Sequence, residues 1–543
     1  MSSIPIPPTT NMTTTNTTFE SMLTLLTLTL VHVERTFYKI PGSAVLARYV
    51  RSSHQNDPGR TVLELILIAF AVRTLMQSRS RDKSQGKMIK FSEKEVDELI
   101  DEWVPEPLSA PLSEWQQRDL TSVPVIAGPN GPKPKLLSTG KTVFNLASYN
   151  FAGLASNEHI KERAIETLRK YGLGSCGPPG FYGTIDVHMD LERDIADFLG
   201  TESTILYSQG FSTITSVIPA FCKRGDVIIA DRAVNFAIQK GIQISRSTIR
   251  WYDHNDLRSL EEVLINVEKE RRKRGAPITR RFIITEGIFE RDGEMVDLPK
   301  LIELKHKYKY RLVLDESISF GSVGRTGRGL TELYNVPASQ IDMLVGSVAN
   351  GLCSVGGFCA GSAIVTEHQR INGTSFVFSA AMPALLAVAG SEGISYLRNT
   401  PSALTTLQEN VAVVRAVLEK TEGITLVGHL TSPIVHFYLK APTYTNGAAN
   451  GTAASSSATV MPPPAGPSFD CEAEEKILQD IVDDVLSNGV MITRAKKLRG
   501  QEMVETRPTI RIAVTAALTR KEMEKAAGIV KASVGKVLGR RKI

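Results

Sequence analysis

The chain has 543 residues, of which 42% are hydrophobic and 22% charged, so it is long enough for two or three packed subdomains of ordinary globular composition. Its 63 basic and 57 acidic residues leave a net charge of +6 with no basic face interleaved with aromatics, which argues against nucleic acid as a partner. No CxxC spacing occurs, so we expect no metal site and a reducing compartment for the main domain; the five cysteines are Cys176, Cys222, Cys353, Cys359 and Cys471.

The first 60 residues are predicted to form a partly disordered tail. Thr9 to Thr18 is nearly all threonine and asparagine, a composition that cannot bury a core. Met22 to Val33 is apolar, but Glu20 precedes it and a basic region is missing, which argues against a signal peptide. Whether Met22 to Val33 is a membrane-associated helix stays open.

A transmembrane segment is predicted over 61–76, whose apolar core runs from Leu65 to Val72. The segment is short, since about 20 residues cross a bilayer, and a buried or interfacial helix is the equal alternative. Basic residues are denser after it, which by the positive-inside rule places residues 1–60 in the lumen and the large domain in the cytosol. They are Arg73, Arg79, Arg81, Lys83, Lys87 and Lys90, against Arg48, Arg51 and Arg60 before the segment.

Residues 77–140 are predicted to be a cytosolic helix followed by a linker. Ser92 and Glu95 have the spacing of a capping box, which predicts a short amphipathic helix reaching Trp103. Pro105 ends that helix, and the proline and glycine residues up to Lys135 favour an extended linker.

Three apolar runs in the main domain each end on an acid, as expected of buried parallel strands. They are VIIAD (227–231), FIITE (282–286) and RLVLD (311–315), and their acids should line one crevice at the carboxyl ends of the strands. An amphipathic helix is predicted from Ile160 to Tyr171, ending at Gly172. The G-x-G-x-x-G spacing that starts at Gly172 comes after a helix and not a strand, so we reject a dinucleotide site there.

The run GSVANGLCSVGGF, from Gly346 to Phe358, resembles the lysine loop of the α-oxoamine synthases, pyridoxal-phosphate enzymes that condense an amino acid with an acyl-CoA. Asn350 stands where that family has its lysine, and the chain has no lysine between Lys309 and Lys420. An amide cannot form the covalent link that tethers the cofactor. The resemblance therefore implies that no catalytic residue lies in this chain and that the cofactor is held mainly by another subunit.

The run GLGSCGPPGFYGTIDVHMDLE (172–192) resembles the family's glycine-rich loop, with Pro179 in place of an arginine. In the family this loop lies at a dimer interface, which implies that five residues shape the partner's site: Cys176, Gly177, Gly180, Phe181 and Tyr182. For Cys176 an inert buried thiol is the alternative. STILYSQGF (203–211) resembles the strand and helix start that receive the cofactor phosphate, so Ser208 and Gly210 belong to that remnant.

The same resemblance implies further remnants of the cofactor site. In DRAVNFAIQKG (231–241) Asn235 replaces the histidine that stacks on the pyridine ring. In the run that begins at Arg311, Asp315 keeps the acid that pairs with the pyridinium nitrogen, and Ile318 replaces a second histidine. FVFSAAMP (376–383) resembles the segment that reaches across the dimer.

The resemblance implies an α/β fold of the type I pyridoxal-phosphate transferases. We expect a large domain over 141–400 with a mainly parallel seven-stranded sheet, and a smaller α/β domain over 401–543 with a disordered insert at 441–468. In PTIRIAVTAAL (508–518) Arg511 falls at the family's substrate-carboxylate position. An ordinary surface arginine is the alternative.

The chain keeps the family's motifs but lacks its lysine and both histidines. In this it resembles the lysine-less subunits of heterodimeric members of the family. These pair with a lysine-bearing paralogue at the endoplasmic reticulum membrane, often with small regulatory membrane subunits, and condense L-serine with palmitoyl-CoA. A self-sufficient acyltransferase with an unusual site, and a regulatory or structural membrane protein that kept only the fold, are the alternatives.

Overall fold

A computed structural model describes residues 31–32, 35–39, 41–84, 91–105, 108–109, 111–275, 277, 279–440, 470–498, 500–504 and 506–540. The predictions for the threonine-rich tail, for nearly all of Met22 to Val33 and for the insert at 441–468 lie outside these residues. The chain divides into two units, residues 1–117 and 118–543, each described here by itself.

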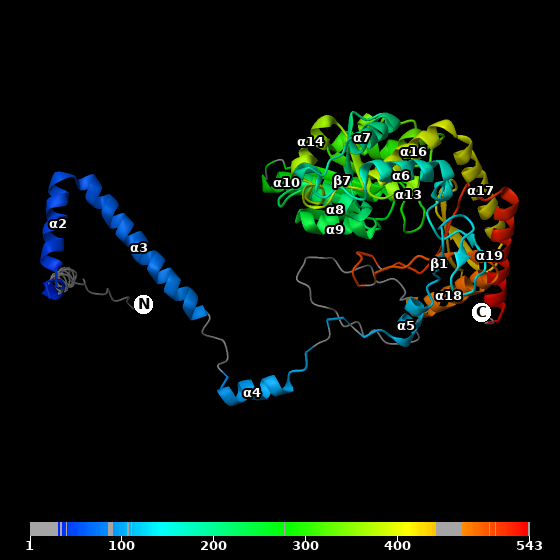
Figure 1. Cartoon of the computed structure of the whole chain (residues 1–543). Coiled ribbons are helices and arrows are strands. Elements are labelled where there is room, and N and C mark those ends of the chain that lie inside the picture. Colours follow the sequence, from blue (N-terminus) through cyan, green and yellow to red (C-terminus); the bar gives the residue numbers. More distant parts are fainter. Residues whose placement is uncertain are drawn as a thin grey trace, which may run out of the picture. The chain divides into compact units, whose positions relative to one another are not determined.

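The first unit consists of helices. α2 (Ser43–Asn56) is followed by α3 (Pro58–Ser84) and α4 (Glu93–Glu102) (Figure 1). The predicted capping box of α4 is confirmed, since the Glu95 N–H donates to Ser92 Oγ at 3.4 Å and the Ser92 N–H donates to Glu95 Oε2 at 2.7 Å. α4 ends at Glu102, before Pro105, as the sequence predicts.

The transmembrane segment predicted at 61–76 lies inside α3, but the prediction of a span is not supported. Among the helices that the structure describes, none combines the length and apolar character needed to cross a bilayer. The uninterrupted apolar run covers only Leu65 to Val72, between Glu64 and Arg73. At 1.5 Å per residue it extends about 12 Å, against a hydrocarbon core of about 30 Å.

The second unit contains the predicted seven-stranded, mainly parallel sheet. Its spatial order is β4 (Ser203–Tyr207), β10 (Gly357–Gly361), β9 (Met343–Ser347), β8 (Arg311–Asp315), β7 (Arg281–Glu286), β5 (Val227–Asp231) and β6 (Thr248–Tyr252). The pairs from β9 through β6 are parallel, whereas β10 runs antiparallel to both of its neighbours. The central strands are buried almost throughout, which explains their nearly continuous apolar sequences.

Helices cover both faces of this sheet (Figure 1). α6 (Glu158–Tyr171) ends at Gly172, which has a φ of 80° as predicted for a helix stop. The other helices are α7 (Asp186–Leu199), α8 (Gly210–Phe221), α9 (Phe236–Ser245), α10 (Leu257–Arg274), α11 (Leu298–Tyr308), α12 (Leu330–Leu333), α13 (Val348–Leu352), α14 (Ala363–Asn372), α15 (Thr374–Phe378) and α16 (Ala384–Asn399).

The carboxyl-terminal part builds a second, antiparallel sheet in the order β11 (Ile424–Val427), β12 (Ile434–Leu439), β15 (Ile510–Ala513) and β14 (Thr493–Arg494). α17 (Ser402–Leu418), α18 (Cys471–Ser487) and α19 (Arg520–Arg540) accompany it. A short parallel pair, β3 (Phe144–Asn145) with β13 (Val490–Met491), joins the entry segment to this part. The boundary at residue 400 stays a prediction.

Part of the predicted linker also folds. α5 (Glu114–Thr121) precedes β1 (Ile126–Ala127), which pairs antiparallel with β2 (Lys135–Leu136). Leu136 is buried with Val143 and Met491 in a small apolar cluster. This apolar contact explains why the proline-rich stretch is ordered here.

Candidate functional site

Two of the three strand-end acids meet, and the third does not. Glu286 and Asp315 are register partners at the ends of β7 and β8. Asp231 is turned away, because its carboxylate accepts from His254 Nδ1 at 3.0 Å and from the Asn255 N–H at 2.6 Å. The prediction of one crevice lined by all three acids is therefore wrong for Asp231, whose carboxylate is bound by the residues just after β6.

Asp315 is held by the side chain of Asn235. Asn235 Nδ2 donates to Asp315 Oδ2 at 3.3 Å, and the Ser317 N–H donates to Asp315 Oδ1 at 2.8 Å. Burial raises the pKa of Asp315, although the hydrogen bonds from Ser317 and Asn235 oppose that shift. The structure thus brings together two residues that the sequence predicted for one site.

Glu286, one of the acids predicted to line the crevice, supports the same corner. Its carboxylate accepts from the Asn235 N–H at 2.6 Å and from the Glu290 N–H at 3.2 Å. Burial raises the pKa of Glu286 well above its ordinary value, and the neighbouring charge of Asp315 adds to the effect. The position of this acid at the end of FIITE predicted its place in the crevice, and its register with Asp315 confirms it.

Asn350 lies in α13, directly after β9. Its Nδ2 donates to the Ser317 carbonyl oxygen at 3.1 Å, and its N–H donates to Ser347 Oγ at 3.3 Å. The contact with Ser317 places Asn350 beside the Asp315 corner. Asn350 thus offers an amide to this site where a primary amine would be needed for a covalent link.

Small residues in the loop allow two backbones to touch. A Cβ on Gly351 would lie 2.3 Å from the Phe320 carbonyl oxygen, so only glycine fits there. Ile318 lies two residues before Phe320, in the segment after β8. It is buried in the hydrophobic core with only 4% of its surface exposed. An apolar side chain therefore fills the position where the family resemblance implies an imidazole.

Ser208 and Gly210 flank the amino end of α8, which begins at Gly210 with Gln209 as its cap residue. A Cβ on Gly210 would lie 3.6 Å from Ser347 Oγ, so this helix end adjoins the strand that leads to Asn350. Free N–H groups at a helix start attract an anion. The structure therefore brings this remnant close to the Asn350 loop, as predicted.

These residues fit part of a pyridoxal phosphate site. The start of α8 suits a phosphate, and Asp315 suits a pyridinium nitrogen because it is a buried acid. Asn350 offers no amine and Asn235 offers no ring. The donor set therefore fits a noncovalently held cofactor and gives no anchor for a covalent one.

Arg511 contacts a hydroxyl group and a carboxylate, and both belong to side chains of this chain. Its Nη1 donates to the Tyr149 hydroxyl at 2.5 Å and to Glu290 Oε1 at 3.3 Å, and its guanidinium stacks 4.5 Å from the Tyr149 ring centre. Tyr149 donates to Glu290 Oε1 at 2.9 Å. Sequence reasoning missed Tyr149 and Glu290, which are far from Arg511 along the chain.

The glycine-rich loop is tightly folded. A Cβ on Gly183 would lie 1.9 Å from the Gly177 carbonyl oxygen, which explains the glycine at 183. Gly180 has open space around its Cβ position, so a side chain there would meet nothing in this chain. The Ala381 N–H donates to the Gly177 carbonyl oxygen at 2.9 Å, which ties the loop to the FVFSAAMP segment.

Three side chains of this loop point outward. Cys176 is exposed and has a φ of 60°, so the alternative of a buried inert thiol is wrong for this chain. Tyr182 is fully exposed at a φ of 66°, and Phe181 is 60% exposed. Bulky residues rarely adopt a left-handed backbone without a local reason.

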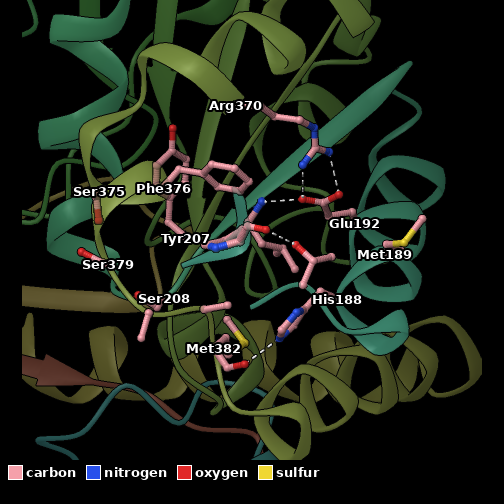
Figure 2. A pocket seen from close by; sticks show the side chains of 15 residues that line it. His188, Met189, Glu192, Tyr207, Ser208, Arg370, Ser375, Phe376, Ser379 and Met382 are labelled. Carbon is pink, nitrogen blue, oxygen red and sulfur yellow. Dashed lines mark hydrogen bonds and ion pairs between the residues drawn. The ribbon is translucent and has the colours of Figure 1, made fainter. Parts of the chain in front are cut away.

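A pocket of about 400 Å³ lies beside the loop, between α7, β4 and the FVFSAAMP segment (Figure 2). His188 Nε2 contacts the Met382 carbonyl oxygen at 2.6 Å, and Arg370 pairs with Glu192 at 2.8 Å (Figure 2). Ser208 also lines it, so the pocket adjoins the start of α8. The sequence had predicted both flanking segments for an interface but not the pocket itself.

The comparisons with known proteins agree with this geometry. Residues 141–530 match the model of the aminotransferase class I and II family. The chain is 44% identical over 404 residues to long chain base biosynthesis protein 1c of Oryza sativa subsp. japonica, covering 74% of this chain and 81% of that protein. It is 36% identical over 516 residues to serine palmitoyltransferase 1 of Saccharomyces cerevisiae, covering 91% and 92%.

Solved structures show the same fold. A serine palmitoyltransferase variant from S. paucimobilis, with a bound PLP–myriocin aldimine, superposes with a TM-score of 0.66 at 21% identity, covering 83% of this chain and 100% of that one. An 8-amino-7-oxononanoate synthase from Francisella tularensis gives a TM-score of 0.56 at 18% identity, covering 74% and 99%.

Proposed function

Because the chain belongs to the aminotransferase class I and II family and, within it, to the long chain base biosynthesis protein 1 and serine palmitoyltransferase 1 group, we propose that it is the non-catalytic subunit of a heterodimeric serine palmitoyltransferase. The enzyme would condense L-serine with palmitoyl-CoA to 3-ketosphinganine. The observation that carries the non-catalytic role is Asn350, whose amide is bonded to the Ser317 carbonyl oxygen at 3.1 Å in the place of an amine.

Pyridoxal phosphate, when bound at the shared site, supplies the electron sink for this condensation. We propose that the lysine-bearing subunit holds it covalently and that this chain shapes the wall of that site. The exposed loop residues Cys176, Phe181 and Tyr182, together with the neighbouring pocket, support a packed contact with a partner. A rigid wall excludes water and positions the substrates, which is the chemistry left to a subunit without a nucleophile.

We further propose that the protein lies at the endoplasmic reticulum membrane with the second unit facing the cytosol, together with small regulatory membrane subunits. The membrane location is supported by the exposed apolar side chains of α3 in the first unit. These side chains are each more than half exposed: Ile66, Leu67, Ile68 and Phe70. Such apolar side chains call for a lipid or protein contact. The proposed cytosolic side rests on the basic residues that follow this apolar run, because the cytoplasmic leaflet carries the anionic lipids that attract such residues.

Purification of this chain alone and together with a lysine-bearing paralogue tests the proposal. A cofactor absorbance band and condensation activity should appear only when both chains are present. Activity of this chain by itself would show a self-sufficient enzyme. Equal activity of the paralogue without this chain would show a regulatory or structural protein.

A further inference from the structure

The cluster of Arg511, Tyr149 and Glu290 lies next to the Asp315 corner. Glu290 connects the two, because its N–H donates to Glu286 at 3.2 Å while its carboxylate accepts from Tyr149 at 2.9 Å and Arg511 at 3.3 Å. Glu286 is in turn the register partner of Asp315. The Glu290 carboxylate therefore binds the Arg511 guanidinium next to the residues predicted as remnants of the cofactor site.

Arg511 is not saturated by these contacts. Its Nε is buried and makes no hydrogen bond within the part of the chain that the structure describes. Its Nη2 reaches only the Ala147 carbonyl oxygen, at a long 3.4 Å. A guanidinium offers a planar fork that matches a carboxylate with two parallel hydrogen bonds, so Arg511 keeps unused capacity for an anion.

The two partners of Arg511 differ in how firmly they are held. Tyr149 is stacked on Phe151 with ring centres 5.4 Å apart, and burial raises the pKa of its hydroxyl well above the ordinary value. The Glu290 side chain is 44% exposed and its carboxylate rests on the cluster from the solvent side. Glu290 is thus the removable partner, and its loss would leave a partly buried cation without its counter-ion.

We propose that Glu290 occupies the place of a ligand carboxylate on Arg511 and Tyr149, and that its removal uncovers a site for small monocarboxylates, including the carboxylate of an amino acid. The wild-type chain is therefore closed to a substrate carboxylate by its own side chain. This block is separate from the missing amine at Asn350. It concerns only this chain's own anion site, so it can hold or fail whatever the subunit role proves to be.

Thermal unfolding of the full chain, without cofactor or partner, tests the proposal. The wild type, Glu290→Ala and Glu290→Gln are compared in sodium acetate and in sodium chloride at equal ionic strength, and in L-serine against 2-aminoethanol, which lacks the carboxylate. Glu290→Ala should gain a saturable rise in Tm of about 2 °C from acetate and L-serine only. Glu290→Gln should respond more weakly, because its amide still fills the space, and the wild type should not respond.

Two controls identify the site. The double variant Glu290→Ala/Arg511→Ala should lose the carboxylate response. Glu502→Ala removes a neighbouring carboxylate that pairs with Arg291 at 2.5 Å, and should create no Arg511-dependent response. The proposal is overturned if the wild type responds as strongly as Glu290→Ala, if L-serine and 2-aminoethanol act alike, or if neither Glu290 variant responds. Should Glu290→Ala fail to fold, Glu290→Ser, whose short side chain also leaves the space open, takes its place in the same comparison.

Discussion

Asn350 and Ser317 are joined by a hydrogen bond of 3.1 Å from the Asn350 amide to the Ser317 carbonyl oxygen. The bond links the loop after β9 to the turn after β8, immediately beside Asp315. An amide side chain, at the position where the family resemblance implies an amine, therefore joins these two segments. The hydrogen bond helps to fix the shape of the corner beside Asp315.

We expect Asn350→Lys alone to restore no activity. The amine would return, but Asn235 still offers no stacking ring and Ile318 still fills the second histidine position with a buried apolar side chain. Borohydride treatment of the isolated wild-type chain with pyridoxal phosphate should likewise trap no cofactor adduct at this site. Turnover by the single variant without a partner, or a trapped adduct on the wild type, contradicts this prediction.

Cys176→Trp should impair the heterodimer but not the fold of this chain. Cys176 is exposed, so the fold of this chain should tolerate a larger side chain there, whereas a packed partner contact would be overfilled at a cost of about 1 to 3 kcal/mol. The measurements are Tm of the chain, co-purification yield, and rates per dimer with L-serine and L-alanine.

Leu430→Trp, at a position 67% exposed and outside this loop, serves as the control and should leave yield and rates unchanged. Reduced yield with normal rates would assign Cys176 to assembly alone. A normal yield with a lower L-serine rate or weaker discrimination against L-alanine would assign it to the wall of the site. Unchanged values for all of these quantities would remove Cys176 from the interface.

Membrane association should depend on the exposed apolar side chains of α3. Replacing both Leu67 and Ile68 by aspartate should move the protein from the microsomal pellet to the supernatant, because an interfacial helix binds through its apolar area and aspartate removes that area. Val45→Asp, at a 69% exposed position of α2, is the control and should have the smaller effect. Equal partitioning of both variants and the wild type would exclude α3 as the anchoring element.

His254 should stabilise the fold in a pH-dependent way. Burial by itself lowers the pKa of His254, but its hydrogen bonds to Asp231 and Asp292 outweigh that effect and raise the pKa to about 10. The folded-state pKa lies above the ordinary value of 6.5, so the contribution is complete below about pH 6.5 and is lost as the pH rises through 10.

His254→Asn should therefore lower the free energy of unfolding by about 3 kcal/mol at pH 6, because it leaves two carboxylates without their cation. The difference from wild type should shrink by pH 9.5, and urea unfolding at both pH values measures it. The surface variant His306→Asn is the control. A difference that stays constant or grows with pH would show that His254 acts through packing and not through its charge.

Residue identity and local spacing alone determined much of this protein. The strands that end at Asp231, Glu286 and Asp315, the stop of α6 at Gly172 and the capping box at Ser92 all arise from patterns within a few residues. The identity of residue 350 as asparagine is read directly from the sequence. That an amide cannot form a covalent link to an aldehyde cofactor could therefore be inferred without coordinates. These features were predicted because their causes are local.

The tertiary structure alone decided which of these groups meet. Arg511 and Tyr149 are 362 residues apart in sequence, and they touch only because β15 of the antiparallel sheet lies against the entry segment. Asp231 turns to His254 because the loop after β6 folds back over the end of β5. The periodicity of a sequence indicates which face of a helix or strand is buried, but not which other segment packs against that face. The hydrogen-bonding partners of a polar side chain depend on that packing.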